Sequence, residues 1–314
     1  MVQYLVGSRA SNLAKAQVRE YLRPLRERFT NIKFTHRTVL EGGDKDRKSH
    51  LSSVSATSGG SAFSTEQEAA LLRGDVDVIV HSLKDLPTAQ PRGLMLLPPP
   101  VREDVRDALC GSSLAGLRKG AKVGTGAPRR IAQLLAVRPD LEIVPIRGNV
   151  PPRLKKIETM GLDAVVLAAA GLRRLGLEDS IDELLPLDLF PPSPGQGALG
   201  IQVRTDDSSA PLREILSVVG DTVVDAEVTA ERAFLGELHG GCSVPVGAYA
   251  KTLTSGDVRL LGQVSSLDGT QQISGVVTGP AGEPEKLGAA LAASLINQGA
   301  HSILDQVRAG SVVT

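Results

Sequence analysis

Two short apolar runs with the same plan constrain the fold of this chain more than any other feature. The first spans Gly74 to Val80 and the second Gly161 to Leu167, and each follows a helix-like segment. Runs of this kind, set between helices, are typical of strands buried on both faces of a parallel sheet. The repeat predicts an α/β fold of two similar lobes flanking a cleft. Ligands of such sheets bind beyond the carboxyl ends of the strands.

Local signals place the elements around the two runs. Ser64 and Gln67 form a possible capping box for a helix that ends at Arg73, and Gly74 suits its C-terminal turn. Pro128 suits the first turn of a helix that runs to Ala136. Strands are predicted at 3–8, 32–40, 76–80, 121–125, 141–146 and 162–170, and further helices at 12–28 and 153–160.

The pattern changes in the last third of the chain. Four prolines between Pro186 and Pro194 predict an extended crossing, followed by a helix at 222–238. Strand and turn signals alternate from Ser243 to about residue 279, and helical signals finish the chain from Pro284. We therefore expect residues 1–98 with 198–216 to form one lobe, 103–192 the second, and 220–314 a small α+β domain.

Composition excludes several classes of function. Lys and Arg number 35, as do Asp and Glu, and aromatic residues make up 3%, so neither nucleic acid nor an anionic membrane is an expected partner. Two cysteines are too few for a disulfide scaffold, and the five histidines show no metal-ligand spacing. The N-terminus lacks the apolar run of a signal peptide, and no stretch is long enough to span a membrane. We expect a cytoplasmic protein without a metal site.

Arginines gather at the ends of the predicted strands of the second lobe. Seven arginines and two lysines stand against four acidic residues between Gly124 and Arg174. A guanidinium binds carboxylate or phosphate through two parallel hydrogen bonds, so this placement favours a polyanion site over a solvated basic face. The arginines at these positions are Arg129, Arg130, Arg147, Arg153, Arg173 and Arg174.

Polar residues also follow the buried strand of the first lobe. Ser82, Lys84 and Asp85 come directly after it, and Arg9 and Ser11 follow the first strand of the chain. An aspartate in this position is often only a turn residue. Opposite an arginine field it could instead hold a cationic part of an anionic ligand, or move a proton.

Cys242 stands between two glycines and Pro245. Glycines allow close approach of the backbone to a ligand, so a free thiol here is a candidate nucleophile or covalent tether. Cys110 has the apolar neighbours of a small buried side chain and is assigned no role. Gly195, Gly197 and Gly200 match the spacing of a dinucleotide fingerprint, but prolines precede them and a strand-like segment follows, which is the wrong context.

Seven short segments of the chain, in their order and spacing, resemble one family. The chain is similar to hydroxymethylbilane synthases, also called porphobilinogen deaminases, from Val6 to about Arg308. The resemblance rests on VHSLKDLPT, GTGAPRR, IRGNV, VVLAAAGLRRLGL, SPGQGALGI, AERAFL and HGGCSVPVGAYA.

The resemblance implies a monomeric cytoplasmic transferase of tetrapyrrole biosynthesis. Such enzymes join four porphobilinogen molecules head to tail, release ammonia each time and give the linear tetrapyrrole hydroxymethylbilane. It also implies two lobes like those of type II, transferrin-like periplasmic binding proteins. A dipyrromethane cofactor would be joined to Cys242 through a thioether.

The family pattern assigns a role to each matching residue. Asp85, Lys84 and Arg9 are expected to be catalytic. Residues expected to hold the cofactor are Cys242, Asp85, Ser82, Lys84, Thr125, Arg129, Arg130 and Gly148. Residues expected to hold substrate carboxylates or complete the pocket are Arg9, Ser11, Arg147, Arg153, Arg174 and Gln196.

Several positions depart from the family pattern, among them the segment STEQE at 64–68, where the family has TKELE. Gly60 replaces a lysine, Ala127 replaces a serine, and Pro152 replaces a threonine, while residues 44–62 are typical of a flexible lid. Two alternatives stay open, and the departures at Gly60 and Ala127 motivate the first of them. One is a diverged paralogue that acts on another pyrrole or another chain length. The other is a non-catalytic protein that binds a small polyanion.

Overall fold

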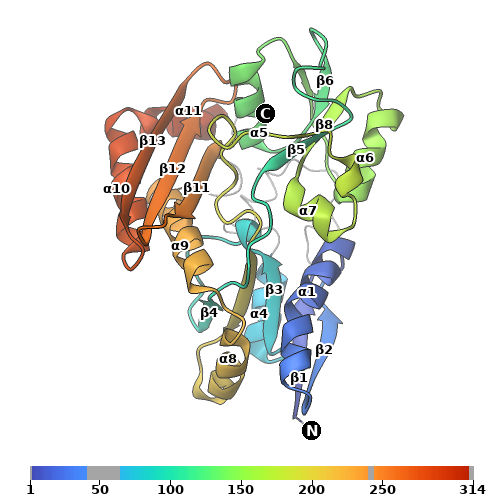
Figure 1. Cartoon of the computed structure of the whole chain (residues 1–314), viewed down its shortest axis with the longest axis vertical. Coiled ribbons are helices and arrows are strands. Elements are labelled where there is room, and N and C mark those ends of the chain that lie inside the picture. Colours follow the sequence, from blue (N-terminus) through green and yellow to red (C-terminus); the bar gives the residue numbers. More distant parts are fainter. Residues whose placement is uncertain (1, 41–63, 240–243, 311–314) are drawn as a thin grey trace. The chain divides into compact units, whose positions relative to one another are not determined.

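The computed structural model describes residues 2–40, 64–239 and 244–310 (Figure 1). The chain divides into two compact units. Unit 1 comprises Met1–Glu103 and Gly197–Asp225, and unit 2 comprises Asp104–Gln196 and Ala226–Thr314. The boundaries of a three-part division, predicted above, stay a prediction.

Unit 1 is built on a five-stranded sheet in the order β2-β1-β3-β10-β4. Strand β1 is parallel to β2 and β3, and β10 lies antiparallel between β3 and β4. Its strands are β1 (Val2–Ser8), β2 (Ile32–Thr38), β3 (Val78–Ser82), β4 (Leu94–Leu97) and β10 (Leu199–Arg204). Its helices are α1 (Asn12–Arg28), α4 (Thr65–Arg73), η1 (Leu83–Asp85), η3 (Asp207–Ser209) and α8 (Ala210–Ser217).

Two helix ends of unit 1 follow the local sequence closely, and one predicted cap does not form. Helix α1 has the predicted bounds, and the Ser11 hydroxyl caps it by accepting a hydrogen bond from Ala14 N (3.1 Å). Helix α4 ends at Gly74, whose φ of 79° is left-handed. The predicted capping box is wrong, because the backbone of Ser64 is not extended and its side chain makes no capping hydrogen bond. Strand β3 begins at Val78, two residues later than predicted.

Unit 2 contains a second five-stranded sheet in the order β7-β6-β8-β5-β9. Strand β6 is parallel to β7 and β8, and β5 lies antiparallel between β8 and β9. Its strands are β5 (Asp107–Cys110), β6 (Lys122–Gly124), β7 (Glu142–Val144), β8 (Ala164–Ala168) and β9 (Glu183–Leu184). The helices around it are α5 (Pro128–Val137), α6 (Val150–Thr159), α7 (Ala169–Arg174) and η2 (Glu178–Ser180).

Several elements of unit 2 differ by a few residues from their predicted bounds, and α6 and β8 show why. Helix α6 begins at Val150 rather than Arg153, because prolines in a first helical turn lose no hydrogen bond. Strand β8 ends at Ala168, and the alanines that follow begin α7. Arg174 therefore lies in the last turn of a short helix instead of directly after a strand.

The two five-stranded sheets have the same strand order and the same strand directions. Strands β1, β2, β3, β10 and β4 of unit 1 correspond to β6, β7, β8, β5 and β9 of unit 2. The repeat predicted from the two apolar runs is confirmed, since these runs form the central strands β3 and β8. The α/β class of both lobes is confirmed as well.

Unit 2 also contains an antiparallel sheet in the order β11-β12-β13. Its strands are β11 (Val246–Thr252), β12 (Asp257–Ser265) and β13 (Gln272–Pro280). Helices α9 (Thr222–Glu237), α10 (Pro284–Asn297) and α11 (Ala300–Gly310) complete this part (Figure 1). Phe234, Leu260, Leu291 and Leu304 share its core. The predicted α+β character of this part is confirmed.

No helix in the described ranges is long and apolar enough to cross a membrane.

Candidate active site

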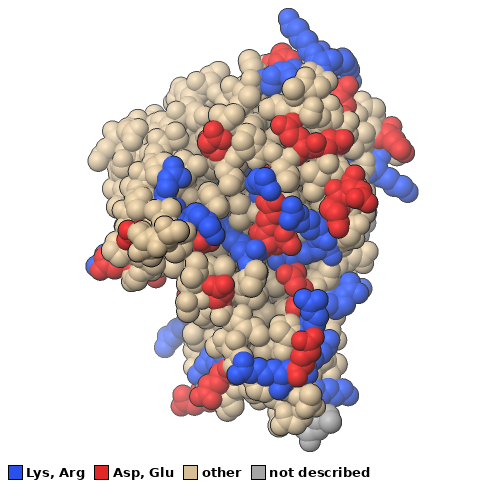
Figure 2. Space-filling view, in the orientation of Figure 1, with Lys and Arg blue, Asp and Glu red and all other residues tan. Residues whose placement is uncertain are grey.

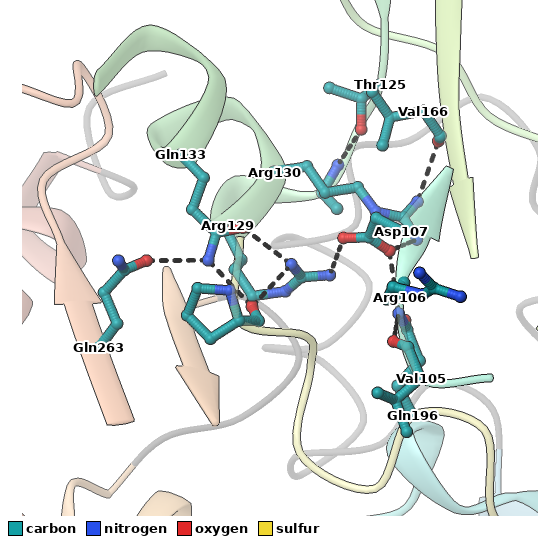
Figure 3. A network of polar contacts seen from close by, with 12 residues as sticks. Val105, Arg106, Asp107, Thr125, Arg129, Arg130, Gln133, Val166, Gln196 and Gln263 are labelled. Atoms are coloured by element: carbon teal, nitrogen blue, oxygen red, sulfur yellow. Dashed lines mark hydrogen bonds and ion pairs between the residues drawn. The ribbon is translucent and has the colours of Figure 1, made fainter. Parts of the chain in front are cut away.

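The best-defined polar cluster of unit 2 lies where β6 leads into α5. Arg129 and Arg130 occupy the first turn of α5, and each is only 6% exposed. Asp107, at the start of β5, lies between them (Figure 3). Its Oδ2 is 2.8 Å from Arg129 Nη2, and its Oδ1 accepts a hydrogen bond from Arg130 Nη2 (2.7 Å).

Asp107 makes this arginine pair tolerable inside the protein. Two cations at the start of a helix meet the positive end of its dipole, and α5 has no acidic residue in its first turn. Burial acts to raise the pKa of Asp107, but the two guanidiniums outweigh it and hold that pKa well below its usual range. Two arginines and one aspartate leave a net charge of plus one, which favours an anion as the further partner.

Neighbouring groups fix the orientation of both guanidiniums. Arg129 Nη1 donates to Gln133 Oε1 (2.8 Å) and to Pro191 O (3.0 Å). Arg130 Nη1 donates to Val166 O (3.0 Å). Gln196 is fully buried, and its Nε2 donates to Val105 O (2.7 Å) and to Asp107 Oδ1 (2.9 Å).

Asp107, Gln133 and Gln263 are members of this cluster that sequence reasoning missed. One signal was present for Asp107, because a charged residue opens the otherwise apolar run Asp107–Cys110. A charge in a fully buried strand requires a partner of opposite sign. The two glutamines carry no comparable signal.

The other predicted arginines of unit 2 are more exposed. Arg147 follows β7 and is half-buried, with its Nη1 atom buried and lacking a hydrogen-bond partner among the described residues. Arg153 Nε donates to Gly148 O (2.7 Å), and the φ of Gly148 is 114°, a conformation that suits glycine. Arg174 is half-buried at the end of α7. Because β7, β6 and β8 are parallel neighbours, their carboxyl ends lie along one edge of the sheet, as predicted.

In unit 1, Ser82, Lys84 and Asp85 lie at the carboxyl end of β3 and in η1, and all three are half-buried. The Ser82 hydroxyl accepts a hydrogen bond from Gln17 Nε2 (2.9 Å). No residue in the described part of the chain donates a hydrogen bond to the Asp85 carboxylate. Asp85 is therefore available to a ligand in a way that Asp107 is not.

Arg9 and Ser11 follow β1 in the same unit. The Ser11 hydroxyl is the cap of α1, which accounts for its position without a ligand. Arg9 is half-buried, and its charge acts on the buried His81 of β3. Burial, with a smaller contribution from Arg9, lowers the pKa of His81 to about 4, so this imidazole is neutral at pH 7.

Cys110 lies among the described residues, and Cys242 does not. Cys110 is buried in the core beside β8, and burial raises the pKa of its thiol to about 12, as expected of an unreactive side chain. Cys242, Gly60 and the expected lid at 44–62 lie outside the described residues. Ala127 provides no side-chain cap for α5, and its own N–H donates to Thr125 Oγ1 (3.3 Å).

Acidic and basic side chains are interspersed over the face shown in Figure 2, in line with the zero net charge. Within the described ranges, no group of three or more histidine, cysteine or acidic side chains could hold a metal ion.

Two family profiles cover most of the chain. Residues 4–211 match the profile described as "Porphobilinogen deaminase, dipyromethane cofactor binding domain". Residues 226–297 match "Porphobilinogen deaminase, C-terminal domain". The chain belongs to the porphobilinogen deaminase family. The family, the enzyme class and the dipyrromethane cofactor implied by the sequence motifs are confirmed.

Curated relatives match over nearly their whole length. The porphobilinogen deaminase of Geobacter sp. (strain M21) is 45% identical over 304 residues, which is 96% of this chain and 94% of the relative. That of Carboxydothermus hydrogenoformans is 41% identical over 309 residues, or 98% and 97% of the two chains.

Solved structures that match are more distant. A methionine binding protein matches with a TM-score of 0.44 at 15% identity, covering 69% of this chain and 89% of that protein. A Salmonella typhimurium periplasmic binding protein with high arginine specificity matches with a TM-score of 0.37 at 14% identity, covering 71% and 94%. These values are too low to support any functional argument.

Proposed function

We propose that this chain joins four porphobilinogen molecules head to tail to give hydroxymethylbilane. In each addition the bond between the aminomethyl carbon and its nitrogen breaks, ammonia leaves, and a ring carbon of the neighbouring pyrrole bonds to the freed carbon and loses a proton. The proposal rests on the match to both family profiles across residues 4–211 and 226–297.

The arginine residues of unit 2 suit the carboxylates of this substrate. Each pyrrole carries an acetate and a propionate, so the growing product accumulates negative charge that fixed guanidiniums can offset. The net positive charge around Asp107 fits such groups, as does Nη1 of Arg147, which has no partner among the described residues. On this basis Arg147, Arg153 and Arg174 hold substrate carboxylates.

The same donors fit a dipyrromethane cofactor, which carries the same kinds of carboxylate. When bound, the cofactor supplies an attached pyrrole end to which the first substrate is added. Arg129 and Arg130 hold its carboxylates, Cys242 forms its thioether, and Thr125 and Gly148 line its site. The buried Gln196 completes the site by fixing Asp107.

Asp85 carries the chemical step in unit 1. Positive charge develops on a pyrrole nitrogen as ammonia leaves, and a carboxylate close to that N–H stabilises it and accepts the proton. The absence of a hydrogen-bond donor to Asp85 from the described residues leaves this carboxylate available. Lys84 and Arg9 supply positive charge beside it, and Ser82 and Ser11 contribute hydroxyl groups.

Intact mass measurement tests the proposal directly. The denatured wild-type chain, purified from cells, should exceed its sequence mass by two linked pyrrole units, and the Cys242→Ala variant should not. Porphobilinogen added to the wild type should be converted to a linear tetrapyrrole with release of ammonia. A wild type that is purified with its sequence mass and still gains no mass with porphobilinogen would leave only the binding-protein alternative, and a product of another length would favour the paralogue.

We also infer that the enzyme acts as a monomer in the cytoplasm, as its family resemblance implies. Light scattering coupled to gel filtration tests the first point, and cell fractionation tests the second.

A further inference from the structure

A chain of hydrogen bonds links the three-stranded sheet of unit 2 to the arginine pair. Gln263 of β12 is 3% exposed, and its Oε1 accepts a hydrogen bond from Gln133 Nε2 (2.9 Å) (Figure 3). The same Gln133 nitrogen donates to Pro191 O (2.9 Å), while Gln133 Oε1 accepts from Arg129 Nη1 (2.8 Å). Gln133 is 1% exposed, so water does not replace these partners.

The bonding pattern leaves Gln133 one favourable orientation. A side-chain amide has two hydrogens to donate and one oxygen that accepts. Gln263 and Pro191 take both hydrogens, so the oxygen faces Arg129. Rotation of the amide by half a turn would bring N–H toward the guanidinium and oxygen toward two other oxygens. Gln263 thus determines, through Gln133, which atom Arg129 meets.

The fold brings the two glutamines together from distant parts of the chain. Alternate residues of β12 face opposite sides of its sheet, and Val258, Leu260 and Val264 belong to the core of that part. Gln263 points to the other side, where it is paired in register with Gly247 of β11. A Cβ atom on Gly247 would lie 2.5 Å from Pro191 O and 3.1 Å from Gln133 Nε2. Glycine at this position permits the close approach.

We propose that Gln263 is a positioning residue for this enzyme, acting through Gln133 to hold Arg129 in the direction required to bind a carboxylate of the cofactor. Arg129 would thus depend on the three-stranded sheet as well as on Asp107. This inference rests on the proposed function, in which Arg129 holds the cofactor. It predicts that a residue of β12 controls how fast the cofactor assembles.

Cofactor assembly on the full-length chain provides the test. Cofactor-free protein, prepared from cells unable to make porphobilinogen, is mixed with porphobilinogen, and its gain in mass is followed with time. Gln263→Met keeps the length of the side chain but removes the acceptor, and should slow the gain by about tenfold, the equivalent of one lost buried hydrogen bond.

A double-mutant cycle separates positioning from general loss of structure. If Gln263 acts through Gln133, the Gln133→Met and Gln263→Met changes combined should be no slower than Gln133→Met alone. Gln272→Met on β13 is the control in the same sheet, since the Gln272 amide contacts Ser265 instead. Its rate of assembly should match the wild type.

Two results would overturn the inference. One is a Gln263→Met protein that assembles the cofactor as fast as wild type. The other is multiplication of the two single effects in the double mutant. Failure of the wild type itself to gain mass would instead contradict the proposed function, so the two failures are distinguishable.

Discussion

The two five-stranded sheets share one topology, but the polar groups at the ends of their strands differ in burial and in pairing. In unit 1 the carboxyl end of β3 leads to Asp85, which is half-buried and accepts no hydrogen bond from the described residues. In unit 2 the carboxyl end of β6 leads to Arg129 and Arg130, which are buried and ion-paired with Asp107 of β5.

Under the proposed function, the two states suit two different chemical tasks. A group that moves a proton must remain accessible and free to change its charge. A group that holds a carboxylate works best when its direction is fixed in advance. Both kinds of group follow the carboxyl ends of parallel strands, although β3 corresponds to β8 and not to β6.

Replacing Asp107 should destabilise the fixed arginine pair of unit 2. Asp107→Asn leaves two buried guanidiniums without their anion, so the free energy of unfolding should fall by about 3–5 kcal/mol. Chemical denaturation measures this loss. Asp305→Asn removes an exposed pair with Arg308 and should cost no more than about 1 kcal/mol. Equal losses in the two variants would contradict the structural role of Asp107.

Replacing Asp85 should leave the fold intact and remove turnover. Asp85→Asn loses the charge that stabilises the developing cation, so kcat should fall by about 10²–10³ while the cofactor is retained. Steady-state kinetics and intact mass measure the two effects. The unfolding midpoint should not change, because no described residue hydrogen-bonds to this carboxylate. Normal turnover would remove the catalytic assignment.

His81 of β3 should make the stability of unit 1 depend on pH. The corresponding strand of unit 2, β8, contains no titratable residue. The pKa of His81 is about 4 in the folded state, below the usual value of 6.5, so the unfolded chain binds a proton that the folded chain excludes between these values. The free energy of unfolding carries no penalty from His81 well above pH 6.5. It should fall by about 3 kcal/mol, through this residue, as the pH drops to 4.

Unfolding free energies measured at intervals between pH 4 and 7 test this expectation. His81→Gln should flatten the curve in this range, while His301→Gln on α11, which leaves His81 in place, should keep the wild-type slope. An unchanged slope in His81→Gln would assign the pH dependence to other groups.

Gly247→Ala should test whether the three-stranded sheet supports the arginine pair in the same unit. The added methyl group must displace Pro191 O, and overpacking of this kind costs about 1–3 kcal/mol. The variant should also assemble the cofactor more slowly, because Pro191 O is an acceptor for Arg129. Gly282→Ala is the control, since a Cβ there meets nothing within 4 Å. Equal behaviour of the two variants would argue against this support.

Much of the fold was predictable because it depends on local sequence. The start of α1 follows from its cap at Ser11, and the left-handed end of α4 follows from Gly74. The apolar runs of β3 and β8 identified the repeat. The capping box predicted at Ser64 was an error, because the backbone of Ser64 does not have the extended geometry of a cap.

The sequence alone determined many of the elements, the family and the set of arginines, because periodicity, caps and ordered motifs are written along the chain. It did not predict the short strands β4, β5 and β9. Only the tertiary structure decided which arginines are buried and what fixes them. Asp107 precedes Arg130 by 23 residues, and Gln263 follows Gln133 by 130. Burial and pairing of charges depend on contacts between such distant residues, and no local pattern specifies them.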